Sequence, residues 1–246
     1  MAWKRSRVRI PSGPPKFSSG TQAGTVIQIT QGGVTVGDGD VVRLRTEYET
    51  TGIALMPGFF SPPVLNALLK KLETSDFNLR REAFIRGSTL ILPQTDPALI
   101  GLHFALNRPE VFQLASQITG IPKPGNFLSR LHRTVPDPEL QLEWHDDASD
   151  GRVLGLNINL SRNPYSGGLL QIRNPGAEVL AEVGQLPPGD AFLFRIGNKW
   201  QHRLTPVESG ERTVAVGWFR LGSEWNTTAL HGFRRSMILS ASEAHQ

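Results

Sequence analysis

Hydrophobic and polar positions alternate along most of the second half of the chain. Seven short runs there place apolar residues at every second position or in brief continuous stretches: NFLSRLHRTV, LQLEWHDD, RVLGLNINL, GLLQIR, DAFLFRI, QHRLTPV and RTVAVGWFRL. Turn sequences such as PDP, NPYSGG, PPGD and ESGE separate the runs. Strands of this length and spacing, without a helical period between them, predict a jelly roll or a barrel.

The first half of the chain follows other periods. The expected elements are hairpins over 25–46, a short buried strand in 52–60, a helix over 61–75 and two helices over 97–119. The first helix is indicated by Ser61, which precedes two prolines and an apolar stripe at helical spacing. The last two helices are expected to break near Pro109. The tail after residue 222 is weakly patterned and has room for a short helix.

Together these patterns predict an α+β, mainly β fold, a double-stranded β-helix (jelly roll) with flanking N-terminal helices. The expected organisation is a basic leader followed by one domain. Its parts are a disordered leader over 1–24 and a single domain over 25–246, with hairpin and helical support in 25–125, the jelly-roll core in 126–220 and a tail in 221–246.

Composition narrows the chemistry that this fold can carry. The 246 residues include no cysteine, so disulfides and cysteine-ligated metal sites are excluded. The net charge of +4 comes from the first 20 residues, which hold five basic residues and no acid, whereas the remainder carries 21 bases against 22 acids. The leader is either a targeting or nucleic-acid-binding arm or a non-functional extension. For the domain we expect a cytoplasmic location, no nucleic-acid partner and no membrane span.

The stretch LEWHDDAS, residues 142–149, is the first candidate site. It suits a solvated turn, a pH-sensitive ion pair or part of a metal site. If it is extended, His145 and Asp147 share one face and Asp146 points away, toward solvent or the backbone. His202, on a later strand, is the best third ligand. Two histidines and one carboxylate form a facial triad that suits Fe(II) and leaves coordination positions open.

The chain resembles the Fe(II)/2-oxoglutarate-dependent dioxygenases, and within them the prolyl 4-hydroxylase-like branch. The matching pieces occur in the family's order: HDD (145–147), GGLLQI (167–172), PPGDAFLF (187–194), HRLTPV (202–207) and ERTVAVGWF (211–219). The resemblance implies that His145, Asp147 and His202 bind Fe(II). It also implies that Arg212 binds the distal carboxylate of 2-oxoglutarate.

The implied reaction consumes 2-oxoglutarate and O2, with ascorbate as an optional reductant, and hydroxylates a C–H bond of a peptidyl, amino-acid or small-metabolite substrate. Succinate and CO2 are the coproducts. Many relatives have a hydroxyl residue two positions after the arginine, where this chain has Val214. They also have a tyrosine on the strand before the first ligand, where Arg130 and His132 share a face and are candidate replacements. Asn157 and Trp200 are candidate substrate-pocket residues.

Two other classes remain open. One is a cupin-type metal-binding jelly roll without oxygenase activity, which would not need Arg212 and commonly has clustered histidines that this chain lacks. The other is a binding module with a decayed oxygenase site, although all four key residues are present. The sequence leaves the oligomeric state open.

Overall fold

The computed structural model describes residues 8–9, 27–80, 85–86, 89–137, 141–149, 151–197 and 199–222. Its helices are α1 (Asp40–Thr51), α2 (Pro62–Leu72), α3 (Pro97–Leu106) and α4 (Pro109–Thr119). Its strands in the first half are β1 (Val8–Arg9), β2 (Gln28–Ile29), β3 (Val34–Thr35), β4 (Ile53–Met56), β5 (Asn78–Arg80), β6 (Ile85–Arg86) and β7 (Thr89–Ile91). The later strands are β8 (Asn126–Thr134), β9 (Gln141–His145), β10 (Arg152–Asn159), β11 (Ser166–Gly167), β12 (Leu170–Arg173), β13 (Val179–Val183), β14 (Ala191–Phe194), β15 (Gln201–Leu204), β16 (Val207–Ser209) and β17 (Arg212–Arg220).

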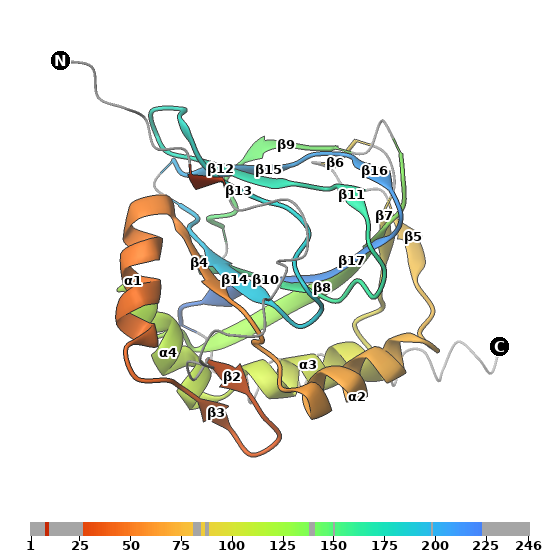
Figure 1. Cartoon of the computed structure of the whole chain (residues 1–246), viewed down its shortest axis with the longest axis horizontal. Helices are drawn as coiled ribbons and strands as arrows, with labels where there is room; N and C mark the ends of the chain where they lie inside the picture. The colour runs from red at the N-terminus through yellow and green to blue at the C-terminus, as the bar shows by residue number, and fades with distance from the viewer. Residues whose placement is uncertain are drawn as a thin grey trace, which may run out of the picture.

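Two large sheets face one another, as Figure 1 shows. The larger has seven strands in the order β4-β14-β10-β17-β8-β7-β5, and the smaller has six in the order β1-β13-β12-β15-β9-β6. Every pairing within them is antiparallel except that of β1 with β13. Two sheets joined this way, with neighbours far apart in sequence, confirm the predicted double-stranded β-helix.

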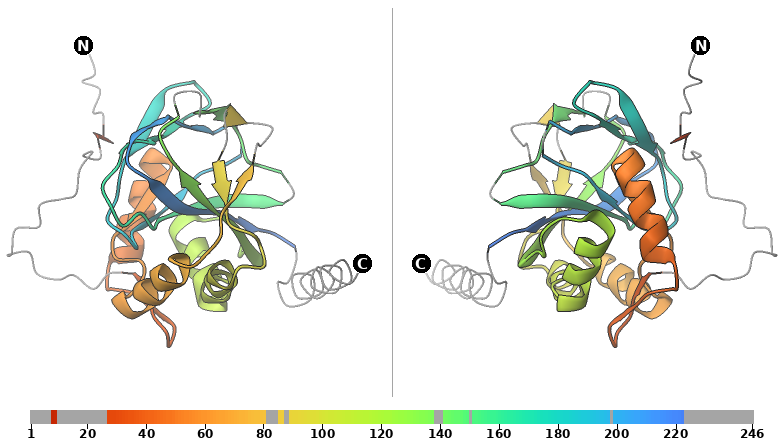
Figure 2. Two further views of the ribbon diagram at one scale, coloured as in Figure 1. Left: turned by 90° about the vertical axis from the view of Figure 1, so that its right-hand side faces the viewer. Right: turned by 90° about the vertical axis from the view of Figure 1, so that its left-hand side faces the viewer.

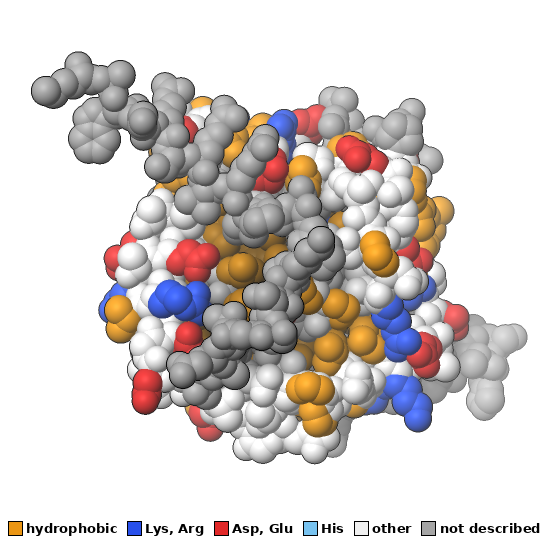
Figure 3. Space-filling model, viewed as in Figure 1, with side chains coloured by type: hydrophobic (Ala, Val, Ile, Leu, Met, Phe, Trp, Pro, Cys, Tyr) orange, Lys and Arg blue, Asp and Glu red, His pale blue; other side chains and the backbone are white. Residues whose placement is uncertain are grey.

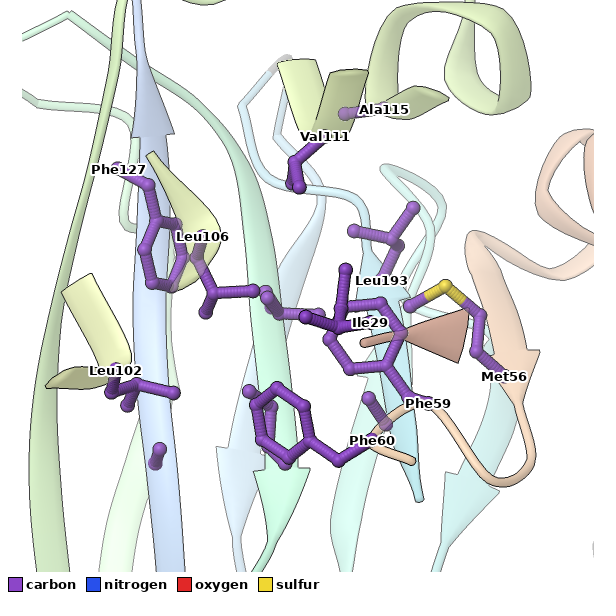
Figure 4. Packing of buried hydrophobic residues seen from close by; sticks show 14 of the residues in the cluster. Ile29, Met56, Phe59, Phe60, Leu102, Leu106, Val111, Ala115, Phe127 and Leu193 are labelled. Carbon is purple, nitrogen blue, oxygen red and sulfur yellow. The ribbon is translucent and has the colours of Figure 1, made fainter. Parts of the chain in front are cut away.

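The main hydrophobic core lies between the seven-stranded sheet and the helices that cover its outer face (Figures 1 and 2). Phe127 and Leu131 of β8 point toward the helices and are fully buried. Figure 4 shows Phe127 beside Leu102 and Leu106 of α3, with Phe59 and Phe60 of the loop after β4 nearby. The even-numbered residues of β8 therefore face the opposite way, into the space between the sheets.

A second hydrophobic cluster fills one end of the space between the two sheets. Its buried members are Ile53, Leu170, Ile172, Ala181, Val183, Leu186, Phe192, Phe194 and Ile196. Leu170 and Phe194 of this cluster also line an open cavity between the sheets. The part of the intersheet space that the cluster does not fill is where a functional site can lie.

Most expected elements are confirmed, and one is wrong. The strand in 52–60, the helix after Ser61 and the two helices broken before Pro109 are present. The hairpin expectation over 25–46 holds only for β2 and β3, because residues 40–51 form α1 instead. Its buried residues, Leu44, Tyr48 and Thr51, recur at intervals of four and three, which is a helical period.

Three features were outside the sequence expectations. Strand β13 and the β5–β7 hairpin were not identified from the sequence. Within the basic leader, Val8–Arg9 pair with the edge of β13. The predicted tail helix lies outside the described residues. No helix among the described residues is long and apolar enough to cross a membrane. On the face shown in Figure 3, basic and acidic side chains are interspersed around the edge.

Gly155 offers a test of how tightly the intersheet space is filled. A Cβ at this position would lie 2.1 Å from Cζ of Phe194, its cross-strand neighbour in β14. Because both residues lie in the middle of a sheet, Gly155→Ala should destabilise the fold by about 1–3 kcal/mol in urea unfolding. Gly32→Ala, where a Cβ meets nothing within 4 Å, is the control and should change stability by less than about 0.5 kcal/mol. Equal stability of the two variants would contradict the packing described here.

Candidate metal centre

Two histidines are brought together by the pairing of β9 with β15. His145, the last residue of β9, lies directly opposite His202 of β15, and their ring centroids are 4.1 Å apart. His202 is 3% exposed, because it also contacts the ring of Phe194 in the facing sheet. Residues 57 positions apart in the chain therefore present their imidazoles at one place.

Asp147 joins the two histidines from the turn that follows β9. Its Oδ1 lies 3.4 Å from Nε2 of His145, and its Oδ2 lies 3.2 Å from Nε2 of His202. One ligand atom from each of the three residues lies within 4.8 Å of the others. Among the described residues this is the one such group of three. The structure thus assembles the facial triad that the sequence predicts.

The turn differs from the extended strand assumed in the sequence argument. Strand β9 ends at His145, so alternation along a strand does not place Asp147. The exposed Asp146 forms the turn instead, because its Oδ1 accepts hydrogen bonds from the backbone N–H groups of Ala148 and Gly197 at 2.9 Å each. These bonds hold the turn against the loop before β15, and Asp147 is thereby directed at His202.

Hydrogen bonds select the ring nitrogen of His145 that faces the site. His145 donates its Nδ1–H to the carbonyl of Glu143 at 2.8 Å, so Nε2, which faces Asp147, is the nitrogen that a metal would bind after losing its proton. Burial raises the pKa of Asp147, but hydrogen bonds from His145 and His202 outweigh it and hold that pKa well below its ordinary value. Burial lowers the pKa of His145, yet Asp147 and the Glu143 carbonyl outweigh it and leave the pKa raised. Burial lowers the pKa of His202.

Trp218 and Arg152 hold the carboxylate of Asp147 from the other sheet. Trp218 donates its Nε1–H to Oδ2 of Asp147 at 2.8 Å. The Arg152 guanidinium lies 4.2 Å above the Trp218 ring, and its Nη1 is 3.9 Å from Oδ1 of Asp147. Sequence reasoning missed both residues, although Trp218 has the same parity on β17 as Arg212. These contacts fix the orientation of a ligand that comes from a turn.

A cavity of about 430 Å³ opens beside the triad, between the two sheets. Its lining comes from both sheets and includes the triad and four of the five other residues proposed from the sequence: Arg130, His132, Asn157 and Arg212. Trp200, the fifth, is not among the described residues that line it. Its ring lies against Gly52, where an added Cβ would come within 2.7 Å, and the Arg195 guanidinium lies over it. The structure therefore does not bring Trp200 together with the other proposed site residues.

Arg212 is the basic group at the inner end of this cavity. It is 5% exposed, and its Nε has no hydrogen-bond partner among the described residues. Gly168 makes room for it, because a Cβ there would lie 2.7 Å from Cδ of Arg212. Thr134, directly opposite Arg212 in β8, and Thr89 also line the cavity, and the buried Oγ1 of Thr89 likewise has no partner within the described part of the chain.

His132 is the neutral group among the cavity's cations. Burial, with the nearby charges of Arg130 and Arg212, lowers the pKa of His132 to about 3. Its imidazole is therefore uncharged at neutral pH and can accept or donate a hydrogen bond without adding to the positive charge. A buried guanidinium with an orphaned N–H, beside two hydroxyls and a neutral imidazole, is suited to a carboxylate.

The donor set fits a first-row divalent metal. Two imidazole nitrogens and one carboxylate favour Fe(II) among other metals, and the three ligands occupy one side of the site. The cavity lies on the remaining side. The fold and this site together define the class of jelly-roll proteins with a 2-His-1-carboxylate centre.

Comparison with known proteins relates part of the chain to one family. Residues 130–220 match the model of the 2OG-Fe(II) oxygenase superfamily. A stretch of 80 residues, 30% of this chain, is 36% identical to a PKHD-type hydroxylase of Synechococcus sp. (strain CC9605). Over these segments the chain is similar to 2OG-Fe(II) oxygenases and, among them, to a PKHD-type hydroxylase. The match spans about a third (34%) of the curated relative's length.

Solved structures agree on the fold. A prolyl-4-hydroxylase of Pseudomonas putida superposes with a TM-score of 0.56 at 20% identity, over 74% of this chain and all of that one. A prolyl hydroxylase of Trichoplax adhaerens, solved with a peptide fragment of a hypoxia-inducible factor, superposes with a TM-score of 0.55 at 18% identity, over 73% of this chain and 88% of that one.

The Trp218 contact predicts a measurable effect on metal affinity. Trp218→Phe keeps an aromatic ring but removes the N–H that holds Asp147, so we expect metal affinity to fall by about 10–100-fold. Titration of metal-free protein with Co(II), followed by its visible absorption, measures this directly. Trp200→Phe is the matched control and should bind Co(II) like the wild type. Unchanged affinity of Trp218→Phe would show that the hydrogen bond does not orient the carboxylate.

The two adjacent aspartates should respond differently to the same substitution. Asp146→Asn keeps the oxygen that accepts two backbone N–H groups, so Co(II) affinity should change little. Asp147→Asn removes a charged ligand, and affinity should fall by more than about 100-fold. The Co(II) titration measures the metal affinity of both variants. The reverse pattern would show that Asp146 is the metal ligand.

Proposed function

We propose that this chain is an Fe(II)- and 2-oxoglutarate-dependent oxygenase that hydroxylates a C–H bond of its substrate. One observation carries the proposal: a single cavity holds both the His145–Asp147–His202 triad and the buried guanidinium of Arg212. A cupin-type metal site has no need of a buried arginine beside it. Three intact ligands also speak against a decayed site.

In this proposal the triad holds Fe(II) through Nε2 of each histidine and a carboxylate oxygen of Asp147. When bound, the iron and 2-oxoglutarate supply the oxidising chemistry, with O2 consumed and succinate and CO2 released. Asp147 is retained as a third protein ligand, which argues for hydroxylation over halogenation, because halogenating relatives give up that ligand.

Arg212 binds the distal carboxylate of 2-oxoglutarate through its planar guanidinium. Val214 cannot supply the hydroxyl that many relatives have there, but the hydroxyls of Thr134 and Thr89 line the same cavity. We assign the second hydrogen bond to these threonines. Neutral His132 replaces the missing tyrosine as a polar neighbour that does not repel the arginine.

Apolar side chains enclose the reacting groups. Leu170, Leu204, Phe194, Val214 and Val216 line the cavity. They exclude water, which strengthens the attraction between Arg212 and a carboxylate because the local dielectric constant is low. Residues 126–220 are proposed as the catalytic core, and residues 25–125 as its support. The substrate is either a peptidyl or amino-acid group or a small metabolite.

The test is an anaerobic titration of the protein with Fe(II) and 2-oxoglutarate, followed by the weak visible charge-transfer band of the bound cosubstrate. We expect the band in the wild type and its loss in His202→Ala. Arg212→Gln should still bind iron but need about 100-fold more 2-oxoglutarate, because charge-assisted hydrogen bonds to a carboxylate are lost.

Arg45→Gln is the control for the loss of one arginine, because Arg45 is half exposed on α1 and pairs with Glu49. It should leave the titration unchanged. Absence of the band in folded wild-type protein would reject the proposal. A band whose 2-oxoglutarate dependence is the same in Arg212→Gln would reject the role of Arg212.

A further inference from the structure

A second cavity of about 450 Å³ adjoins the metal centre. It lies between the β5–β7 hairpin and the ends of β8 and β17, and it shares Arg130, Arg152 and Trp218 with the first cavity. The shared residues form the boundary between the two spaces. A group bound in the second cavity therefore lies next to the side chains that also line the metal centre.

The second cavity, which we call the arginine compartment, is strongly basic. Its described lining residues include four arginines, Arg80, Arg130, Arg152 and Arg220, and no aspartate or glutamate. A concave site lined by charges of one sign concentrates its electric field and attracts ligands of the opposite sign. Asn78, Gln94 and Thr95 add uncharged polar groups to the same lining.

The fold places two of these arginines against each other. Arg152 of β10 lies directly across from Arg220 of β17 in the sheet register. Like charges that face each other on neighbouring strands are destabilising. An anion that contacts both guanidiniums reduces that repulsion, so the register places two cationic groups where one anionic group can contact both.

Arg152 connects the arginine compartment to the reaction centre. Its guanidinium is stacked on Trp218, and its Nη1 lies 3.9 Å from Oδ1 of Asp147. The stacking holds the planar group in one orientation, which favours a geometrically defined contact with an oxyanion. A molecule whose anionic group contacts Arg152 therefore has its neighbouring atoms beside the metal ligands.

We propose that the arginine compartment binds a carboxylate or phosphate group of the substrate, and that the substrate is a small acid-bearing molecule. The two cavities, of about 430 and 450 Å³, have the size of small-molecule sites. An uncharged analogue would leave the arginines without the anion and bind more weakly. The identity of the substrate class rests on the proposed oxygenase function, whereas binding of an anion in the compartment does not.

The first experiment measures anion binding without any metal. Inorganic phosphate is titrated into the full chain by calorimetry, with the wild type, Arg80→Gln/Arg220→Gln and Arg212→Gln compared. We expect the double variant to bind phosphate about tenfold more weakly or worse. Arg80→Lys/Arg220→Lys, which keeps the charge, should recover part of the affinity and guards against misfolding as the cause. Arg45→Gln should behave like the wild type.

Three results of this titration would overturn the proposal. One is no phosphate binding by folded wild-type protein. Another is equal affinity in the wild type and the Arg80→Gln/Arg220→Gln variant. The third is loss of binding in Arg212→Gln alone, which would place the anion in the first cavity.

The second experiment measures substrate preference through succinate release with Fe(II) and 2-oxoglutarate. Small carboxylic acids are compared with their primary amides on the same carbon skeletons. We expect the acids to stimulate succinate release and the amides to do so at least about tenfold less, a preference that Arg80→Gln/Arg220→Gln should lose. Equal stimulation by acids and amides would overturn the inference.

The two proposals fail in different ways. Phosphate binding that depends on Arg80 and Arg220, in a protein that shows no charge-transfer band, would reject the oxygenase function and keep the anion site. A charge-transfer band in a protein whose phosphate affinity does not depend on Arg80 and Arg220 would support the oxygenase function and reject the arginine compartment as an anion site.

Discussion

The register between β9 and β15 is the constraint on which the site depends. His145 and His202 face the intersheet space because they are paired directly across the ladder. A shift of one residue would turn a strand's side chains over. His202 would then point to the outer surface, where Trp144 lies between the guanidiniums of Arg173 and Arg203. The stacking of Arg173 and Arg203 on Trp144 holds Trp144 and Arg203 on the outer face of the sheet. These contacts therefore oppose a one-residue register shift, which would separate the two histidines.

The rest of the site is fastened to this pair from the opposite sheet. Asp147 comes from a turn, and turns are less rigid than strands. Two restraints compensate: Asp146 accepts hydrogen bonds from Ala148 and Gly197, and Trp218 donates to Asp147. Because Trp218 belongs to β17, the strand that carries Arg212 also orients a metal ligand. The cosubstrate arginine and the metal carboxylate are thus positioned by one rigid element.

The sequence pointed to His145, Asp147, His202 and Arg212 because each lies in a short stretch with a specific pattern, and the structure places all four around one cavity. The sequence also predicted the jelly roll, since alternation with turns is a strong signal. Helix α1 was missed because its buried positions, Leu44, Tyr48 and Thr51, are sparse among polar residues that also alternate. The β5–β7 hairpin was missed because β5 has no buried position.

Residues that act through distant partners were harder to find. Thr134 reaches the site because the β8–β17 register sets it opposite Arg212, and Gly168 matters because the Arg212 side chain passes over it. Neither contact can be predicted from the residues next to Thr134 or Gly168 in the sequence. Trp200 lies apart from the cavity beside the triad because of its local backbone. It stands two residues before a ligand, but it follows the left-handed Lys199 and turns toward Gly52.

Charge balance links the two cavities. The first cavity is lined by three arginines and two aspartates. With its histidines neutral, the formal charge of this lining is +1. A divalent cation and a dicarboxylate cancel each other and do not change that excess. Arg80 and Arg220 add to it from the arginine compartment. Arg80 lies on the exposed strand β5, whereas Arg152 is partly buried beside Asp147. A substrate anion held in the arginine compartment would therefore have its charge closest to the metal centre at the shared Arg152.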